Sequence, residues 1–289
     1  MIYLENDFIK VAFSIKGAEL QKLVNKRNGE NYLWKGDANF WGKFSPVLFP
    51  IVGGLKNNTY TYKGENYQLG RHGFARDKDF TITEQSKDEV FFTSVDSPET
   101  HAVFPFKFRF GVRYKLNGAN LECSYEVLNP DQENDLYFSI GGHPAFAIQT
   151  ATGLNYDDYF LQFNHDDVLI YHEIENDLIS NRTQSIQLMG GRLDLRHDLF
   201  YKDAMVFKTL KSDTISIRNT KNDHGLDFKF ERFPYFGIWA AKDADFICLE
   251  PWCGVADVIG HNQELTTKEG IVNLAPQESF SRAWSVTLI

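Results

Sequence analysis

His143 is a candidate proton donor or acceptor because of the residues on either side of it. Gly141-Gly142 precede it and Pro144 follows it, so the chain can turn sharply or approach another group closely there and is then rigid. Histidine is the side chain most easily tuned to exchange protons near neutral pH. We therefore expect His143 at the mouth of a sheet, where it could act as an acid or base. The structural alternative is a turn in which the histidine satisfies a local hydrogen bond.

Glu250 is a candidate for the complementary role. It ends the apolar run of residues 246–249 and is followed by Pro251, which we expect to stop the strand. A carboxylate at the end of a buried strand loses hydration, so it needs either a function or a partner. As a functional group it could accept a proton. As a structural group it would form an ion pair with an arginine.

Arg71, His72 and Arg76 form a third group, with a glycine among them. Strand alternation would place residues 72, 74 and 76 on one face, so that His72 and Arg76 point together into a cleft with Phe74 between them. Guanidinium groups bind hydroxyl or phosphate oxygens through charge-assisted hydrogen bonds. The alternative is a surface turn with solvated arginines.

Asp203 begins a short apolar run and is the fourth candidate. A lone aspartate at the start of a strand usually caps a turn, and its functional alternative is contact with a ligand. Asp203, Glu250 and the two histidines could also ligate a metal. However, the close H-x-H spacing of metal-binding β-barrels is absent around both histidines, so we expect no metal site.

Short strand-like segments must position these groups. Asn28-Gly29 and Asn117-Gly118 predict hairpin turns, and Pro46 and Pro50 restrict residues 44–52 to a loop or an edge strand. Strand patterns occur in residues 2–34, 59–69, 80–85, 89–95, 106–116, 120–129, 136–140, 159–163, 168–171, 203–208, 214–218, 225–230, 236–240, 246–250 and 281–289.

The absence of a long amphipathic helix, of a tandem repeat and of a linker indicates an all-β protein. We expect a large antiparallel β-sandwich that forms one domain over residues 1–289. The alternative is a boundary between two domains near residues 150–155.

Composition excludes several classes of protein. A formal net charge of −9 argues against nucleic acid and anionic membranes as partners and leaves a small molecule as the expected ligand. The chain lacks G-x-S-x-G, a Walker loop and a G-x-G-x-x-G motif after a strand. Serine hydrolases, nucleotide hydrolases and dinucleotide-dependent enzymes therefore lack their usual residues here.

Cysteine usage and the N-terminal residues predict the compartment. Cys123, Cys248 and Cys253 are odd in number and form no C-x-x-C pair, which argues against a disulfide scaffold or a cysteine zinc site. The first residues show no basic region followed by an apolar one, and no run of about 18 apolar residues is present. We expect a cytoplasmic protein.

Five segments in order resemble the aldose 1-epimerase (galactose mutarotase-like) family, and most closely its LacX-type branch. Any one of them is weak, but together they span most of the chain and are fairly specific. They are residues 49–56 (FPIVGGLK), 71–76 (RHGFAR), 141–146 (GGHPAF), 203–207 (DAMVF) and 248–252 (CLEPW).

The resemblance implies a β-supersandwich that interconverts the α and β anomers of an aldose. By this likeness His143 would protonate the ring oxygen and Glu250 would take the proton from the C1 hydroxyl. His72 would help to hold the ring-oxygen region, and Asp203 would bind sugar hydroxyls. We expect the acid and the base to lie on opposite sides of the sugar, across a gap as wide as one pyranose. Because the reaction needs no electron sink or hydride carrier, we expect no cofactor.

The chain departs from the galactose mutarotases at one loop. Those proteins carry an arginine where this chain has Lys56-Asn57-Asn58, whereas Arg71 and Arg76 resemble the phosphate-binding arginines of the hexose-6-phosphate mutarotase branch. A sugar phosphate is therefore an alternative substrate. A non-catalytic carbohydrate-binding protein and a polysaccharide lyase or hydrolase are further alternatives. Trp252 or Phe74 could stack on the sugar, although both residue types more often belong to the core.

Overall fold

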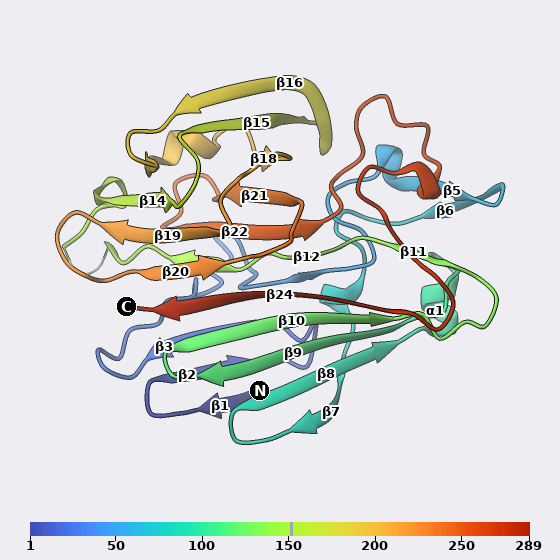
Figure 1. The fold of residues 1–289 in the computed structure, drawn as a ribbon, viewed down its shortest axis with the longest axis horizontal. Coiled ribbons are helices and arrows are strands. Elements are labelled where there is room, and N and C mark those ends of the chain that lie inside the picture. Colours follow the sequence, from blue (N-terminus) through green and yellow to red (C-terminus); the bar gives the residue numbers. More distant parts are fainter. Residues whose placement is uncertain (151–152) are drawn as a thin grey trace.

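Two large antiparallel sheets carry most of the chain in the computed structural model, which describes residues 1–150 and 153–289 (Figure 1). In Figure 1 the long strands β24, β10, β9 and β8 lie side by side below, and β16, β15, β18 and β21 lie above them. Every pair of named strands is antiparallel. The expected all-β, antiparallel sandwich is confirmed.

The nine-stranded sheet takes strands from both halves of the chain. In spatial order it contains β17 (Arg192–Asp194), β14 (Tyr159–Phe163), β19 (Thr214–Asn219), β20 (Leu226–Lys229), β24 (Ser279–Leu288), β10 (Asn120–Leu128), β9 (Arg109–Asn117), β8 (Glu89–Val95) and β7 (Thr81–Gln85). The C-terminal strand β24 thus joins strands from either side of the alternative domain boundary at 150–155. Residues 151 and 152 of that boundary lie outside the described part of the chain.

The eight-stranded sheet is the one that holds the candidate residues. In spatial order it contains β16 (Leu178–Gln187), β15 (Val168–Glu175), β18 (Met205–Phe207), β21 (Tyr235–Trp239), β22 (Phe246–Cys253), β12 (Ile140–Gly142) and β4 (Val47–Leu48), with β13 (Ala145–Ala147) paired to β22. Strand β4 is an edge strand, as the prolines around it predict.

Smaller elements complete the described chain. They are the sheets β1 (Ile2–Glu5), β2 (Ile9–Phe13) and β3 (Leu20–Asn25), β5 (Thr59–Tyr62) with β6 (Glu65–Gln68), and β11 (Leu136–Phe138) with β23 (Val272–Leu274), the helix α1 (Pro98–His101), and the 3-10 turns Lys56–Asn58, Ala75–Asp77, Tyr156–Asp158, His197–Phe200 and Leu265–Thr267. Within residues 1–150 and 153–289, no helix is long and apolar enough to cross a membrane.

Alternating apolar residues bury one face of each sheet against the other. In β10, Leu121, Cys123, Tyr125 and Val127 are buried while their neighbours are more exposed. Aromatic rings join the layers, since the rings of Phe146 on β13 and Phe228 on β20 lie 5.5 Å apart. The abundance of phenylalanine and tyrosine in the sequence therefore supplies the core between the sheets.

Three local expectations about strands were wrong. Strand β16 was missed because its residues are mostly polar and exposed, so no apolar period marks it. Strand β22 does not stop at Glu250 but continues through Pro251 to Cys253. Residues 71–77 form a turn and a 3-10 helix instead of a strand, so the alternation expected for residues 72, 74 and 76 does not apply.

Candidate active site

A cavity of about 270 Å³ lies beside His143 and Glu250. Five of the six predicted site residues line it: Arg71, His72, Arg76, His143 and Glu250. The remaining lining residues are Trp41, Gly53, Ile174, Asp177, Ile179, Ala204, Val206, Trp239, Trp252, Val255 and Ala256. The structure therefore brings together predicted residues that are up to 179 positions apart in the chain (Arg71 to Glu250), in a cavity with both polar and aromatic walls.

Glu250 is held in the middle of the eight-stranded sheet. It stands opposite Gly237 in the register of β21 and β22, and it is only 2% exposed. Trp252 is two residues further along β22, on the same face. Its indole ring has room against the neighbouring strands because Gly141 and Gly237 have no side chains. A Cβ atom at either glycine would collide with the indole ring. The two glycines and the tryptophan therefore fix the surroundings of the carboxylate.

His143 contacts Glu250 directly. The imidazole Nε2 lies 3.3 Å from the carboxylate Oε2, and the imidazole ring stacks on Trp41 with 4.9 Å between ring centres. Trp239 meets the same imidazole edge-on at 5.7 Å. The expected gap as wide as a pyranose between acid and base is thus wrong, because the two groups lie side by side. Trp41 and Trp239 were missed since single tryptophans in the sequence carry no signal of a cavity wall.

Burial shifts both members of this pair toward their neutral forms. It raises the pKa of Glu250 well above its usual value, an effect increased by Asp203 and opposed by Arg71 and Trp252. It lowers the pKa of His143 to about 3, with Arg71 and Arg76 contributing to the same shift. Burial therefore favours a state of the pair that carries no charge on either group.

His72 is held by the glycine loop beside it. The residue adopts a left-handed backbone (φ 67°), its N–H donates to the carbonyl of Gly53, and the Gly53 N–H donates to imidazole Nδ1 at 3.0 Å. The Nε2 atom faces the Nε–H of Arg71, and a neutral imidazole has one acceptor nitrogen, so the tautomer decides which of these two bonds His72 accepts. Burial and the nearby Arg71 keep the pKa of His72 well below its usual value. A left-handed histidine at a cavity is strain of the kind that concentrates at functional sites.

Arg71 contacts the other imidazole nitrogen of His72. Its Nε lies 3.2 Å from Nε2 of His72, and the Nε–H is directed at that nitrogen. The Nη1 atom of Arg71 is paired with Asp177 at 2.6 Å, a partner in the turn between β15 and β16 that sequence reasoning missed. Arg76 donates a hydrogen bond from Nη2 to the backbone carbonyl of Arg71, and this bond connects the two residues.

Two predicted positions lie away from this cavity. Asp203 lines a neighbouring hollow and accepts a hydrogen bond from the N–H of Ala204, which itself reaches the cavity. Its charge is near enough to raise the pKa of Glu250, and its contact with a sugar stays a prediction. Phe74 packs on Phe49, Phe104 and Phe108 in the core instead of pointing into the cleft.

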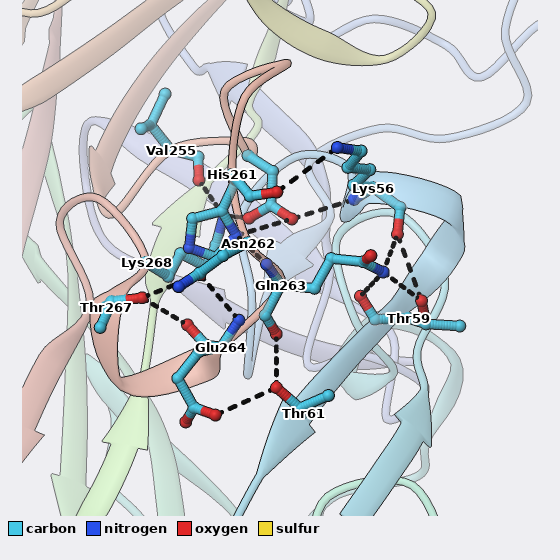
Figure 2. Close-up of polar contacts among 11 residues, drawn as sticks. Lys56, Thr59, Thr61, Val255, His261, Asn262, Gln263, Glu264, Thr267 and Lys268 are labelled. Atoms are coloured by element: carbon cyan, nitrogen blue, oxygen red, sulfur yellow. Dashed lines mark hydrogen bonds and ion pairs between the residues drawn. The ribbon is translucent and has the colours of Figure 1, made fainter. Parts of the chain in front are cut away.

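A buried ion pair supports the wall behind the cavity (Figure 2). Lys268 Nζ lies 2.8 Å from Asp257 Oδ1 and donates to the carbonyl of Val255, which lines the cavity. Neither charged side chain is exposed. Asp257 also accepts from the backbone N–H of Lys56, and its own N–H donates to Gly54 next to the loop that holds His72. The pair therefore connects three segments around the site.

Solved structures with similar chains share this architecture. A galactose mutarotase related enzyme from Lactobacillus acidophilus is 34% identical, with a TM-score of 0.95 over 100% of this chain and 97% of the other. A galactose mutarotase-like protein from Lactobacillus casei is 31% identical, with a TM-score of 0.91 over 100% of both chains. The fold thus defines a galactose mutarotase-like protein.

The sequence comparisons agree with the structural ones. The family model described as aldose 1-epimerase matches residues 1–272. The chromosomal LacX protein of Lactococcus lactis subsp. lactis is 29% identical, in an alignment that covers 100% of this chain and 99% of that protein. The chain belongs to the aldose 1-epimerase family.

Replacing Lys268 should destabilise the fold. Lys268→Met leaves the buried Asp257 carboxylate without its charge partner, and we expect the free energy of unfolding to fall by about 3–5 kcal/mol. Urea denaturation measures this change. Lys56→Met is the matched control, because the bond from residue 56 to Asp257 comes from the backbone, and it should change stability by no more than about 0.5 kcal/mol. Equal effects of the two substitutions would contradict the role assigned to the ion pair.

Proposed function

We propose that the protein is an aldose 1-epimerase that interconverts the α and β anomers of an aldohexose by acid–base ring opening. The observation that carries the proposal is the 3.3 Å contact between His143 and Glu250 beside a cavity. Family membership supports the same reaction class.

The side-by-side arrangement suits the bonds that change. Ring opening removes a proton from O1, delivers one to O5 and breaks the C1–O5 bond. Both oxygens are attached to C1, so an acid and a base that are neighbours can reach them together. The open-chain aldehyde turns about C1–C2 and recloses on its other face, which returns both protons and leaves the protein unchanged.

The assignment of roles follows from the family resemblance. His143 donates to O5 and Glu250 accepts from O1. This requires a proton shared by the pair to lie on the imidazole when the sugar reacts. The contact between the two groups allows that transfer, and Arg71 lowers the pKa of both groups, so the bound sugar would have to decide where the proton lies.

Other residues would hold the sugar. His72, Arg71 and Arg76 line the cavity and could meet sugar oxygens, the two guanidinium groups as charged donors. Trp41, Trp239 and other apolar side chains of the cavity suit the C–H faces of a pyranose. Asp203 is proposed to bind hydroxyls from the neighbouring hollow.

Removing either proton-transfer group should slow anomer exchange without preventing binding. We expect His143→Asn and Glu250→Gln each to lower kcat by about 10²–10⁴-fold, since positioned acid or base groups contribute that much. Sugar affinity should change only a few-fold. NMR saturation exchange measures the rate and calorimetry the affinity.

The matched controls are His101→Asn and Glu122→Gln, which lie outside the cavity lining and should retain the rate. A wild-type protein that binds a sugar but shows no rate above buffer would favour the non-catalytic binding protein. A change in product mass would instead indicate a lyase or hydrolase, because mutarotation leaves mass unchanged.

The pH profile should reflect the buried pair. Activity needs one shared proton, and the pair gains a second only near the lowered pKa of His143, at about 3. The raised pKa of Glu250 delays loss of the last proton. We therefore expect kcat/KM to stay constant from pH 7 down to about 5, well below the ordinary histidine value near 6.5. Circular dichroism at each pH controls for unfolding, and an acid limb centred near 6.5 would contradict the assignment.

The charge around Arg71 favours a free sugar over a phosphorylated one. Asp177 already pairs with Arg71, so a phosphate there would meet a competing carboxylate. We expect kcat/KM to be higher for a free aldohexose than for its 6-phosphate. Asp177→Asn should narrow the difference by about 1.4- to fivefold, since exposed pairs contribute about 0.2–1 kcal/mol. A wild-type preference for the phosphate would support the hexose-6-phosphate alternative instead.

A further inference from the structure

Cys248 lies next to His143 and Glu250. It precedes Glu250 by two residues on β22, so the two side chains lie on the same face of the strand. Trp239 on β21 and Ala145 on β13 stand opposite Cys248, and the thiol is fully buried. The proposed epimerase reaction makes no use of this thiol.

The sulfur, an imidazole nitrogen and a carboxylate oxygen are close enough to share one ion. The ligand atoms of His143, Cys248 and Glu250 all lie within 4.8 Å of one another. In a tetrahedral zinc site, neighbouring donor atoms are about 3.3–3.6 Å apart, and the 3.3 Å between His143 and Glu250 already matches this. The sulfur would need to approach by no more than roughly 1.3 Å, the excess of the 4.8 Å limit over that spacing.

A second feature of the site also indicates a missing ligand. Glu250 is 2% exposed, and the polar contact of its Oε2 atom among residues 1–150 and 153–289 is the one with His143 at 3.3 Å, which leaves this oxygen able to bind an ion as well. His143 Nδ1 has no hydrogen-bond partner in the described part of the chain. Buried carboxylate oxygens with few partners are costly, and an ion bound there would satisfy this one.

We propose that His143, Cys248 and Glu250 form a binding site for a zinc-class divalent cation, which blocks the proposed epimerase reaction by occupying its acid–base pair. Thiolate and imidazole ligands select zinc-class ions over magnesium or calcium. Two of the four tetrahedral positions would be filled by groups that line the cavity, and the fourth is left for water or a sugar hydroxyl.

The charges and protons of the bound state balance. A thiolate and a carboxylate together neutralise the two positive charges of the ion, while the histidine binds as a neutral ligand. Binding releases the thiol proton of Cys248 and the proton shared by His143 and Glu250 to solvent, and no electron is transferred. Affinity should therefore increase with pH. This part of the proposal does not depend on the catalytic one, because the three ligands are present whether or not the protein isomerises a sugar.

Cobalt provides a direct spectroscopic test with the metal alone. We expect Co²⁺ added to the reduced protein to give a thiolate-to-cobalt charge-transfer band that Zn²⁺ abolishes by displacement. The band should be absent in Cys248→Ser and in Cys248→Ala, a second variant in case a buried hydroxyl disturbs folding. Cys123→Ser is the matched control, because Cys123 is equally buried but lies on β10 in the other sheet, and it should retain the band. A band that persists without Cys248, or wild-type protein that gives none, would overturn the proposal.

Affinity and inhibition extend the test. Calorimetry should show Zn²⁺ binding at least about tenfold weaker in Cys248→Ser and Glu250→Gln than in wild type, since even groups outside the ligand set change metal affinity by 10–100-fold. Zn²⁺ should inhibit anomer exchange in wild type in competition with sugar but not in Cys248→Ser, which should retain its basal rate. If wild type lacks epimerase activity, the cobalt band and the calorimetric difference still decide the metal site. Equal zinc affinity in wild type and Cys248→Ser would refute it.

Discussion

The contact between His143 and Glu250 is the constraint on which the site depends. Both groups are removed from water, and burial makes a charge on either of them costly, which raises the pKa of Glu250 and lowers that of His143. Keeping them together without hydration requires a sheet that fixes one and a loop that fixes the other. Strand β22 supplies the first, and the short connection between β12 and β13, at His143 and Pro144, supplies the second. The surrounding aromatic rings keep the pair dry and limit its motion.

Around this pair, backbone hydrogen bonds couple the cavity walls to one another. The loop at Gly53 and Gly54 binds His72 on one side and Asp257 on the other. The backbone carbonyl of Asp257 in turn accepts a hydrogen bond from the N–H of Ile179, which places strand β16 against the same wall. Residues from four distant parts of the chain are thereby held in one arrangement before any sugar binds, which reduces the ordering that binding would otherwise require.

Sequence reasoning was most successful where a pattern is local. Period-two alternation predicted most strands, and glycine beside histidine marked His143. It failed where tertiary contacts decide the structure. Strand β16 is exposed and polar, so its pairing with β15 leaves no trace in hydrophobic period. The residues around His72 form a turn instead of the expected strand, because the Gly53 N–H donates a hydrogen bond to the imidazole of His72. Three further features depend on contacts between segments that are far apart in the chain: the short distance between His143 and Glu250, the Arg71–Asp177 pair and the aromatic wall. The spacing of these segments along the chain carries no information about their proximity.

The position of Trp252 has a consequence for the range of molecules that fit beside Glu250. Its indole ring has room against the neighbouring strands only because positions 141 and 237, almost a hundred residues apart, are glycines without a Cβ atom. The size of the cavity therefore depends partly on the absence of a Cβ atom at these two positions. An alanine at either position would displace a ring that forms part of the cavity lining beside Glu250, so the smallest possible change in the framework would alter the shape of the cavity.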